Sequence, residues 1–140
     1  MMFEDCEKKL YLVVDRNKDI ALLMNAIAHI SSGILLKEKD LNFHDYQNQE
    51  SGLCAYLNNY PVIILQSKNS SQLATLALKC QAAEICYNFF TTTMLGSSSA
   101  EQINLTRQTP LENLDFVALA VYGDTEQLKP LMKKFSVFKA

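Results

Sequence analysis

The chain has few glycines, and this scarcity excludes two common kinds of catalytic loop. It contains four glycines among 140 residues, and they stand far apart, at Gly33, Gly52, Gly96 and Gly123. A phosphate-binding loop needs closely spaced glycines so that the backbone can approach the phosphates, and the nucleophile elbow of α/β-hydrolases needs Gly-x-Ser-x-Gly. The sequence therefore predicts neither a nucleotide-binding loop nor a serine-hydrolase elbow.

Metal-binding and disulfide patterns are also missing. The two histidines and four cysteines show neither a Cys-x-x-Cys pair nor zinc spacing: His29, His44, Cys6, Cys54, Cys80 and Cys86. We therefore predict no metal and no cofactor, and we expect reduced thiols in a cytoplasmic protein. A nucleophilic pair of Cys54 with His44 stays open as an alternative, although nothing in the sequence would favour the thiolate form.

Positive charge is scattered rather than gathered into a patch. The chain has 13 Lys and Arg residues against 15 Asp and Glu residues, a net charge of −2. Nucleic-acid-binding proteins usually concentrate cations to hold phosphates. The one gathering here is Lys129, Lys133, Lys134 and Lys139, which we interpret as a solubilising face, with a phosphate-binding patch as the alternative. The composition argues against a nucleic-acid partner.

No segment has the pattern of a signal peptide or a membrane span. Residues 1–6 are acidic where a signal peptide carries positive charge. The uncharged run over residues 20–36 is interrupted by Asn25, His29, Ser31 and Ser32, which makes it a poor membrane span. We expect a protein without membrane contact.

Strand-like and helix-like segments alternate along the chain. Strands are predicted at residues 10–14, 61–66, 85–91 and 115–123, and helices at 20–36 and 70–83, with two shorter helices beginning near Ser98 and Asp124. Continuous apolar strands are covered on both faces. The predicted fold is a three-layer α/β/α sandwich around a mixed four-stranded sheet, forming a single α/β domain over 1–140. Its core spans 8–140, and residues 37–60 form a loop or hairpin insertion.

Helix starts and buried stripes follow from local spacing. Asn17 or Asp19 can cap the first helix, the polar groups of Asn69-Ser70-Ser71-Gln72 can cap the second, and Ser98 with Glu101 has the spacing of a capping box. The expected buried stripes are Ile20, Leu23, Met24, Ile27, Ile30 and Ile34 on the first helix, and Leu73, Leu76, Ala77 and Cys80 on the second.

The first predicted helix, residues 20–36, has no charged residue, and this is the most informative feature of the chain. A surface helix normally carries charge on its solvent side, so we expect the second side to be covered or to form a site. Asn25 and His29 lie there one turn apart and can address the same ligand. The alternative is that His29 makes a structural hydrogen bond beneath the 37–60 segment.

Two further polar segments are candidates for the same site. The run Thr91-Thr92-Thr93 ends the third predicted strand, and ligands of α/β proteins bind beyond the carboxyl ends of parallel strands. Its hydroxyls could receive an anion, with a simple turn and helix cap as the alternative. The loop that carries Asp45 is expected to close over Asn25 and His29.

The order of these segments resembles that of the type II peptidyl-tRNA hydrolases, and more closely an uncharacterised bacterial family with that fold. The similarity covers the chain from about Leu10 onward and rests on Leu12-Val13-Val14, on Asn25-Ala26-Ile27-Ala28-His29, on the Asp45 loop, on the Tyr60-Pro61 strand and on Thr91 to Met94. It implies a peptidyl-tRNA hydrolase-like fold, in which His29 matches the helix histidine of the hydrolases.

The chain departs from the hydrolases at two points. Their lysines before the histidine correspond to Ile20 and Leu22, and their Asp-Ala-Gly segment corresponds to Thr92-Thr93-Met94. These changes remove the cations that would hold tRNA phosphates and the carboxylate that would orient water or the histidine.

Two functions follow as hypotheses. The first is a small-molecule-binding or regulatory domain that keeps the hydrolase scaffold, with its ligand against Asn25, His29, Asp45 and Thr91 to Thr93. The second is a hydrolase of an ester or amide, with His29 as general base and Asn25 or Thr93 polarising the carbonyl. A homodimer is a further expectation, since the uncharged helix side could pack on a symmetric copy or be covered by residues 37–60.

Overall fold

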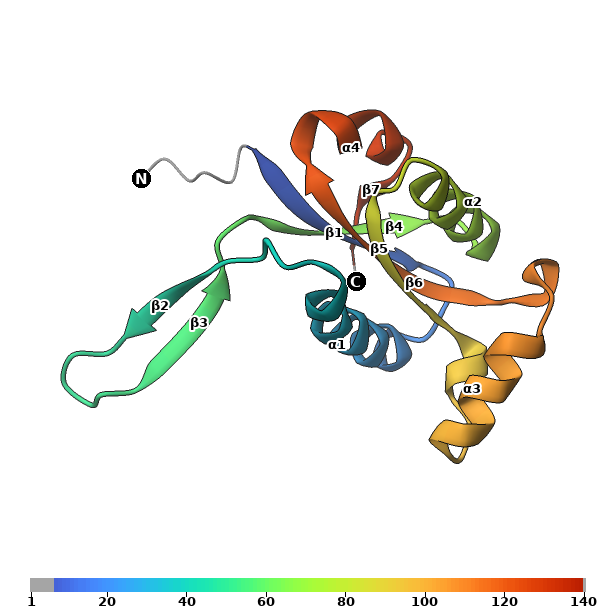
Figure 1. The fold of residues 1–140 in the computed structure, drawn as a ribbon, viewed down its shortest axis with the longest axis horizontal. Helices are drawn as coiled ribbons and strands as arrows, with labels where there is room; N and C mark the ends of the chain where they lie inside the picture. Colours follow the sequence, from blue (N-terminus) through green and yellow to red (C-terminus); the bar gives the residue numbers. More distant parts are fainter. Residues whose placement is uncertain (1–6, 140) are drawn as a thin grey trace.

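The computed structural model describes residues 7–139 and forms a mixed α/β fold (Figure 1). Its elements, in chain order, are β1 (Lys8–Asp15), α1 (Ile20–Lys37), β2 (Phe43–Gln47), β3 (Cys54–Asn58), β4 (Val62–Ser67), α2 (Ser70–Ala82), β5 (Cys86–Thr91), the 3₁₀ turn η2 (Thr92–Met94), α3 (Ser99–Gln108), the 3₁₀ turn η3 (Leu111–Asn113), β6 (Phe116–Asp124), α4 (Thr125–Met132) and β7 (Ser136–Val137).

The main sheet has five strands in the order β5-β6-β1-β4-β7. β1 and β4 are parallel, while the pairs β1–β6, β5–β6 and β4–β7 are antiparallel. The sheet is mixed as predicted, but the predicted number of four strands is wrong. The missed strand is β7, whose two residues pair with Leu65 and Gln66. So short an edge strand has no periodicity that a sequence pattern could reveal.

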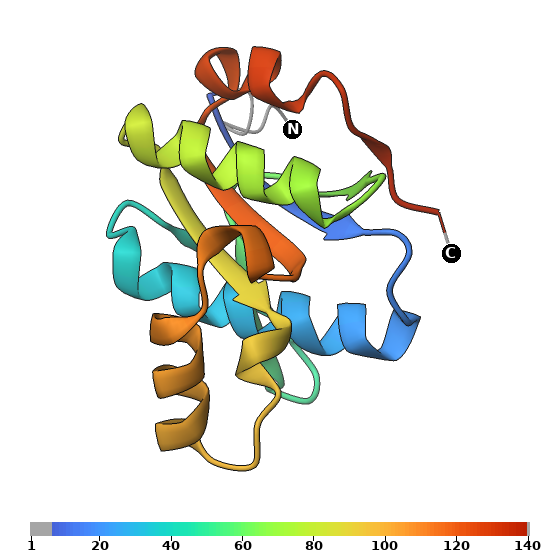
Figure 2. The same cartoon turned by 90° about the vertical axis from the view of Figure 1, so that its right-hand side faces the viewer.

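The sheet has an apolar layer on each face, because alternate strand residues point to opposite sides. On one face Tyr11 and Val13 pack with α2 and α4, and on the other Leu10, Leu12 and Val14 pack with α1. Figures 1 and 2 show α2 and α4 above the sheet and α1 below it. The arrangement therefore has three layers.

Three helices begin at the predicted capping residues. The side chains of Asp19, Asn69 and Ser98 accept hydrogen bonds from backbone N–H groups of the first turns of α1, α2 and α3. These bonds satisfy donors that a helix N-terminus leaves unpaired. The predicted stripe of α2 is confirmed, since Leu73, Leu76, Ala77 and Cys80 are its buried residues.

The predicted stripe of α1 is partly wrong. The buried residues are Leu23, Ala26, Ile30 and Ile34, whereas Ile20 and Met24 are 47% and 62% exposed. The helix turns the small Ala26 toward the sheet, which allows a close approach. By length and composition alone α1 could cross a membrane, but one side of it packs on the sheet as a core helix does.

The expected cover over the second side of α1 does not form. Asn25 and His29 are both exposed, because the 37–60 segment turns away from them. Its strands β2 and β3 make a separate two-stranded antiparallel hairpin, which extends to one side in Figure 1. Cys54 on this hairpin, Cys80 and Cys86 are free thiols, and Cys6 lies outside the described residues.

Candidate functional site

Polar side chains gather where β1, β4 and β5 end. These three strands run in the same direction, so Asp15, Ser67 and Thr91 lie along one edge of the sheet, and β6 begins at the same edge. All three residues are buried. Ligands of α/β proteins tend to bind near such an edge, so the hydrogen-bond partners of these polar groups decide whether a site can form there.

The central group is an ion-pair network around Lys18. Its ammonium lies 3.0 Å from Asp15 Oδ2 and 2.9 Å from Asp115 Oδ1, and the backbone N–H of Asn17 donates to Asp15 Oδ1 at 3.0 Å. Burial alone would lower the pKa of Lys18, but its hydrogen bonds to Asp115 and Asp15 outweigh burial and raise that pKa. The network is internally satisfied and ties the end of β1 to the start of β6.

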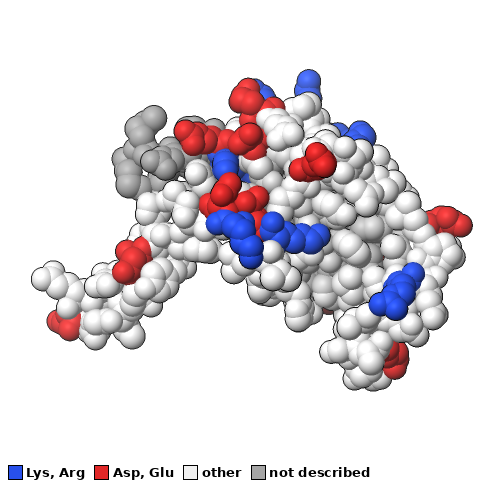
Figure 3. Space-filling view, in the orientation of Figure 1, with Lys and Arg blue, Asp and Glu red and all other residues white. Residues whose placement is uncertain are grey.

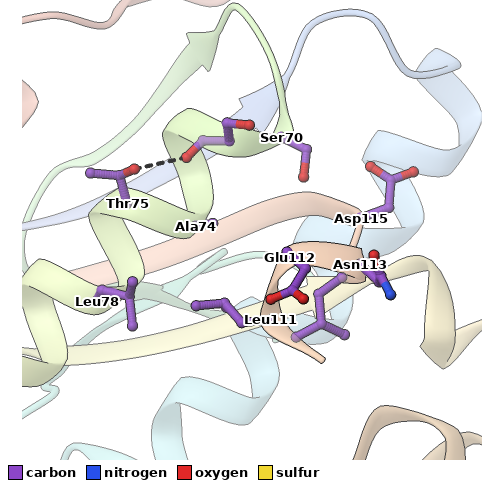
Figure 4. A pocket seen from close by; sticks show the side chains of 10 residues that line it. Ser70, Ala74, Thr75, Leu78, Leu111, Glu112, Asn113 and Asp115 are labelled. Carbon is purple, nitrogen blue, oxygen red and sulfur yellow. Dashed lines mark hydrogen bonds between the residues drawn. The ribbon is translucent and has the colours of Figure 1, made fainter. Parts of the chain in front are cut away.

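A first cleft, of about 510 Å³, lies between α2 and η3 and is shown in Figure 4. Three of its polar side chains serve the fold. The hydroxyl of Ser70 accepts a hydrogen bond from the backbone N–H of Phe116 at 2.6 Å, that of Thr75 donates to the carbonyl of Ser71, and Asp115 pairs with Lys18. The rest of the lining combines aliphatic side chains with the exposed Ser71, Glu112 and Asn113.

A second cleft, of about 320 Å³, lies between α1, β5 and α3 and contains the two residues singled out on α1. Eight residues line it: Asn25, His29, Ile30, Asn88, Phe89, Phe90, Met94 and Gln102. The His29 ring stacks on Phe90, with centroids 5.9 Å apart and planes at 29°. This contact places the imidazole beside Phe90 in the cleft wall, and His29 remains exposed. We call this the His29 cleft.

The polar groups of the His29 cleft differ in their hydrogen bonding. Asn88 donates to the carbonyl of Ile30 at 3.2 Å, and Gln102 donates to the carbonyl of Gly96 at 2.7 Å. Those bonds orient the two carboxamides and leave further donor or acceptor capacity on each. Within residues 7–139, the side chains of Asn25 and His29 make no hydrogen bond. They are the groups with full capacity for a ligand.

The threonine run is turned inward. Thr91 Oγ1 and Thr93 Oγ1 lie 2.6 Å apart, Thr93 bonds Thr106 of α3 at 2.8 Å, and Thr106 donates to the carbonyl of Gln102. Thr91 and Thr93 are buried, and Thr92 is half-buried. The structure thus places Thr91 and Thr93 in a chain of hydroxyls that fastens α3 to η2, beside the cleft rather than in its lining.

Asp45 is not brought to the His29 cleft. It lies on β2, paired with Tyr56 across the hairpin, and it accepts hydrogen bonds from Cys54 Sγ at 2.9 Å and Gln47 Nε2 at 3.2 Å. The hairpin carries it away from the body of the molecule (Figure 1). The expected closure over Asn25 fails because the 37–60 segment is a hairpin instead of a folded-back loop.

Sequence reasoning missed the side chains that complete the cleft. Asn88 interrupts an otherwise apolar and aromatic strand, and this was a usable signal. Gln102 carried no signal in the sequence, because its position in the cleft depends on how α3 packs against the rest of the molecule. Among the described residues, the cleft lining includes no Asp, Glu, Lys or Arg, and residues 7–139 hold no cluster of His, Cys, Asp or Glu suited to a metal ion. The lining can therefore recognise donors and acceptors on an uncharged molecule.

Comparison with known proteins identifies a family and a fold. Residues 8–139 match the model of DUF2000, a family described as proteins of unknown function, so the chain belongs to the DUF2000 family. No curated protein matches the chain. The solved structure of a protein of unknown function from Agrobacterium tumefaciens strain C58 matches with a TM-score of 0.82 at 14% identity, over 99% of this chain and 100% of that one. At that identity the likeness shows a shared fold and nothing of activity.

Proposed function

We propose that this member of the DUF2000 family binds a small uncharged molecule in the His29 cleft. The carrying observation is that Asn25 and His29, one helical turn apart, face a cavity with hydrogen-bonding capacity that no residue of 7–139 uses. The volume of about 320 Å³ lies at the small end of ligand pockets. An occupant of roughly ten non-hydrogen atoms suits that volume.

The lining indicates the chemistry of the ligand. A charged molecule would lose hydration without gaining a counter-ion, because the lining is neutral. Three carboxamides and an imidazole offer paired donors and acceptors, while Phe90 and Met94 supply an apolar wall. This combination favours a flat, neutral ring or carboxamide that presents both a donor and an acceptor.

The competing hypothesis is hydrolysis of an ester or amide by His29, as the resemblance to type II peptidyl-tRNA hydrolases implies. It draws support from the position of His29, which matches the helix histidine of those enzymes, and from the exposure of His29 in the cleft. It lacks a carboxylate beside the base, since Asp45 lies on the hairpin and Asp15 is engaged with Lys18. Binding without turnover is therefore our preferred function.

A matched pair of probes tests the proposal. Nicotinamide and nicotinate have the same ring and size, but the first is neutral and the second is an anion. In an NMR titration to about 10 mM, we expect nicotinamide to shift the resonances of Asn25, Asn88 and Gln102 saturably, and nicotinate to bind at least about 10-fold more weakly. The variants Asn25→Ala and His29→Ala should lose the nicotinamide response, whereas Ser32→Ala, outside the cleft lining on α1, should keep it.

Three outcomes would contradict this proposal. Equal binding of the anion, or a nicotinamide response that survives both substitutions, would exclude a neutral-ligand site at Asn25 and His29. Hydrolysis of peptidyl-tRNA by the purified chain, lost in His29→Ala, would replace the binding function by the enzymatic one.

A further inference from the structure

The hairpin formed by β2 and β3 is stabilised mainly by its own pairing. Its register runs from Phe43 opposite Asn58 to Gln47 opposite Cys54, and beyond its root it lies to one side of the rest of the molecule in Figure 1. A two-stranded hairpin is marginally stable in water unless it packs on something else. We call this hairpin, residues 43–58, the arm. Packing against another surface would stabilise it.

Large apolar side chains occupy this arm where a solvated hairpin would carry polar ones. Exposed fractions are 46% for Phe43, 48% for Tyr46, 74% for Leu53, 68% for Tyr56 and 53% for Leu57. The segment 41–60 holds no Lys or Arg, and Asp45 and Glu50 are its two charged residues. In Figure 3 the arm is correspondingly white apart from small red areas. Exposed apolar patches of this kind mark interaction surfaces.

An apolar recess lies at the root of the arm. It has a volume of about 170 Å³ and is bounded by α1, the start of β4 and the hairpin, with Ile34, Leu35, Phe43 and Val62 among its lining residues. Leu35, Leu36 and Val62 beside it are 45%, 80% and 47% exposed. Phe43 and Tyr56 lie on the same side of the hairpin, since their positions differ by one residue pair that faces the other way. The apolar surface thus continues from the recess onto the arm.

We infer that the hairpin is a dimerisation arm, and that its partner is a second copy of this chain. A projection and a recess on one molecule complement each other when two copies are related by a two-fold axis, because each arm then covers the root of the other. On the recess side the exposed apolar side chains are Phe43 and Tyr56 of the arm and Leu35, Leu36 and Val62 at its root, since Tyr46 and Leu57 face the other way. They present on the order of 600 Å² per protomer, which would supply the apolar part of a standard interface of about 800 Å² per partner.

The inference is independent of the His29 cleft. The residues of the recess and arm are not among those that line the cleft, apart from the shared helix α1. Loss of ligand binding in a cleft variant therefore says nothing about dimerisation, and the two proposals can fail separately.

Sedimentation equilibrium of the full chain, from about 1 µM to about 100 µM, tests the arm directly. We expect the mass to approach twice the 15.8 kDa of one chain at the upper end. Tyr56→Lys should raise the dimer Kd by about 30-fold or more, as loss of a central aromatic contact does. Ile103→Lys is the matched control, because Ile103 is 60% exposed on α3, away from the arm, and should leave the Kd unchanged.

Hydrogen exchange at the two ends of that concentration range locates the interface. We expect slower exchange in residues 43–58 at the higher concentration, and no such difference in Tyr56→Lys. A chain that stays at 15.8 kDa up to about 100 µM would overturn the inference. So would a dimer that Tyr56→Lys leaves intact, or whose protected amides lie outside the arm and its recess.

Discussion

The two faces of the sheet are covered in different ways. On one face α2, α4 and the segment after α4 pack a continuous apolar layer that includes Leu73, Leu76, Cys80 and Leu128, each at most 1% exposed. On the other face α1 is the main cover, and it leaves the His29 cleft at one side and the hairpin recess at the other. The α2 face therefore has a continuous apolar layer with a cleft between α2 and η3, and the α1 face has two openings, the His29 cleft and the hairpin recess.

The polar groups follow the same division. Beside α2, the hydroxyls of Ser70 and Thr75 and the carboxylate of Asp115 are taken up by the backbone and by Lys18. Beside α1, Asn25 and His29 keep their capacity. The cleft beside α2 therefore has three polar side chains engaged within the fold, whereas Asn25 and His29 of the smaller His29 cleft are not engaged. The difference teaches that hydrogen-bonding state distinguishes the two clefts more sharply than volume does.

The largest effect on stability is expected from a substitution of Asp15 in the ion-pair network around Lys18. Asp15 is 2% exposed and accepts from Asn17 and Lys18. Asp15→Ala should lower the free energy of unfolding by about 3 kcal/mol, because it leaves buried donors unpaired. Urea denaturation measures this loss. The control is Asp45→Ala on the exposed hairpin, expected within about 0.5 kcal/mol. Similar losses of stability in both variants would contradict the stabilising role of the ion-pair network around Lys18.

The apolar layer beneath α2 also predicts that the stability of the folded state depends on pH. Burial, with a smaller contribution from Cys86, raises the pKa of the Cys80 thiol from 9.0 to about 11. The folded state then retains a proton that the unfolded state releases, so stability falls as pH rises from about 9 to about 11, by at most about 1.4 kcal/mol per pH unit. Cys80→Ala should flatten this part of the profile, and Cys54→Ala, at an exposed thiol, should not. Parallel profiles for all three proteins would refute a buried neutral thiol.

A smaller loss should follow from breaking the chain of hydroxyls beside the open cleft. Thr93→Val keeps the shape of the side chain but removes the bonds to Thr91 and Thr106. We expect a loss of about 2 kcal/mol, since partners are left without a bond in a buried place. The isosteric control Thr92→Val, at a half-buried neighbour, should cost less than about 0.5 kcal/mol. If Thr92→Val proved the costlier, the hydroxyl chain would not be what fastens α3.

Substitution of Gly33 is expected to have the smallest effect on stability, while it displaces Asn88 in the His29 cleft. A Cβ there would lie 2.7 Å from Asn88 Nδ2. Gly33→Ala should gain about 1 kcal/mol of helix propensity and lose a similar amount as Asn88 gives up its bond to Ile30, so that unfolding is nearly unchanged. The NMR response to nicotinamide should weaken, because Asn88 has moved. An unchanged response would remove Asn88 from the proposed recognition.

Local patterns predicted the elements well, because caps and periodicity depend on neighbours in the chain. Asp19, Asn69 and Ser98 act at the helix starts as predicted, and the α2 stripe is correct. The errors concern relations across the sheet. The exposure of Met24 depends on how α1 is rotated over its face, and β7 exists because a two-residue segment reaches β4. The local spacing of residues predicts neither the exposure of Met24 nor the presence of β7.

The site divides along the same line. The pairing of Asn25 with His29 follows from helical geometry and could be predicted. The inward turn of Thr93 depends on Thr106, and the absence of Asp45 from the cleft depends on the path of a long insertion. Contacts between distant segments decided both.

The attachment of α3 has a consequence for the energetics of the cleft. This helix has no buried residue, and its link to the molecule runs through Thr106 and Gln102. Such an element detaches at a small fraction of the global unfolding free energy. Since Gln102 supplies one wall of the cleft, the affinity for the proposed ligand would be the intrinsic association constant multiplied by the fraction of molecules in which α3 is docked. Substitutions on the outer surface of α3 would then change the occupancy of the cleft without contacting the ligand.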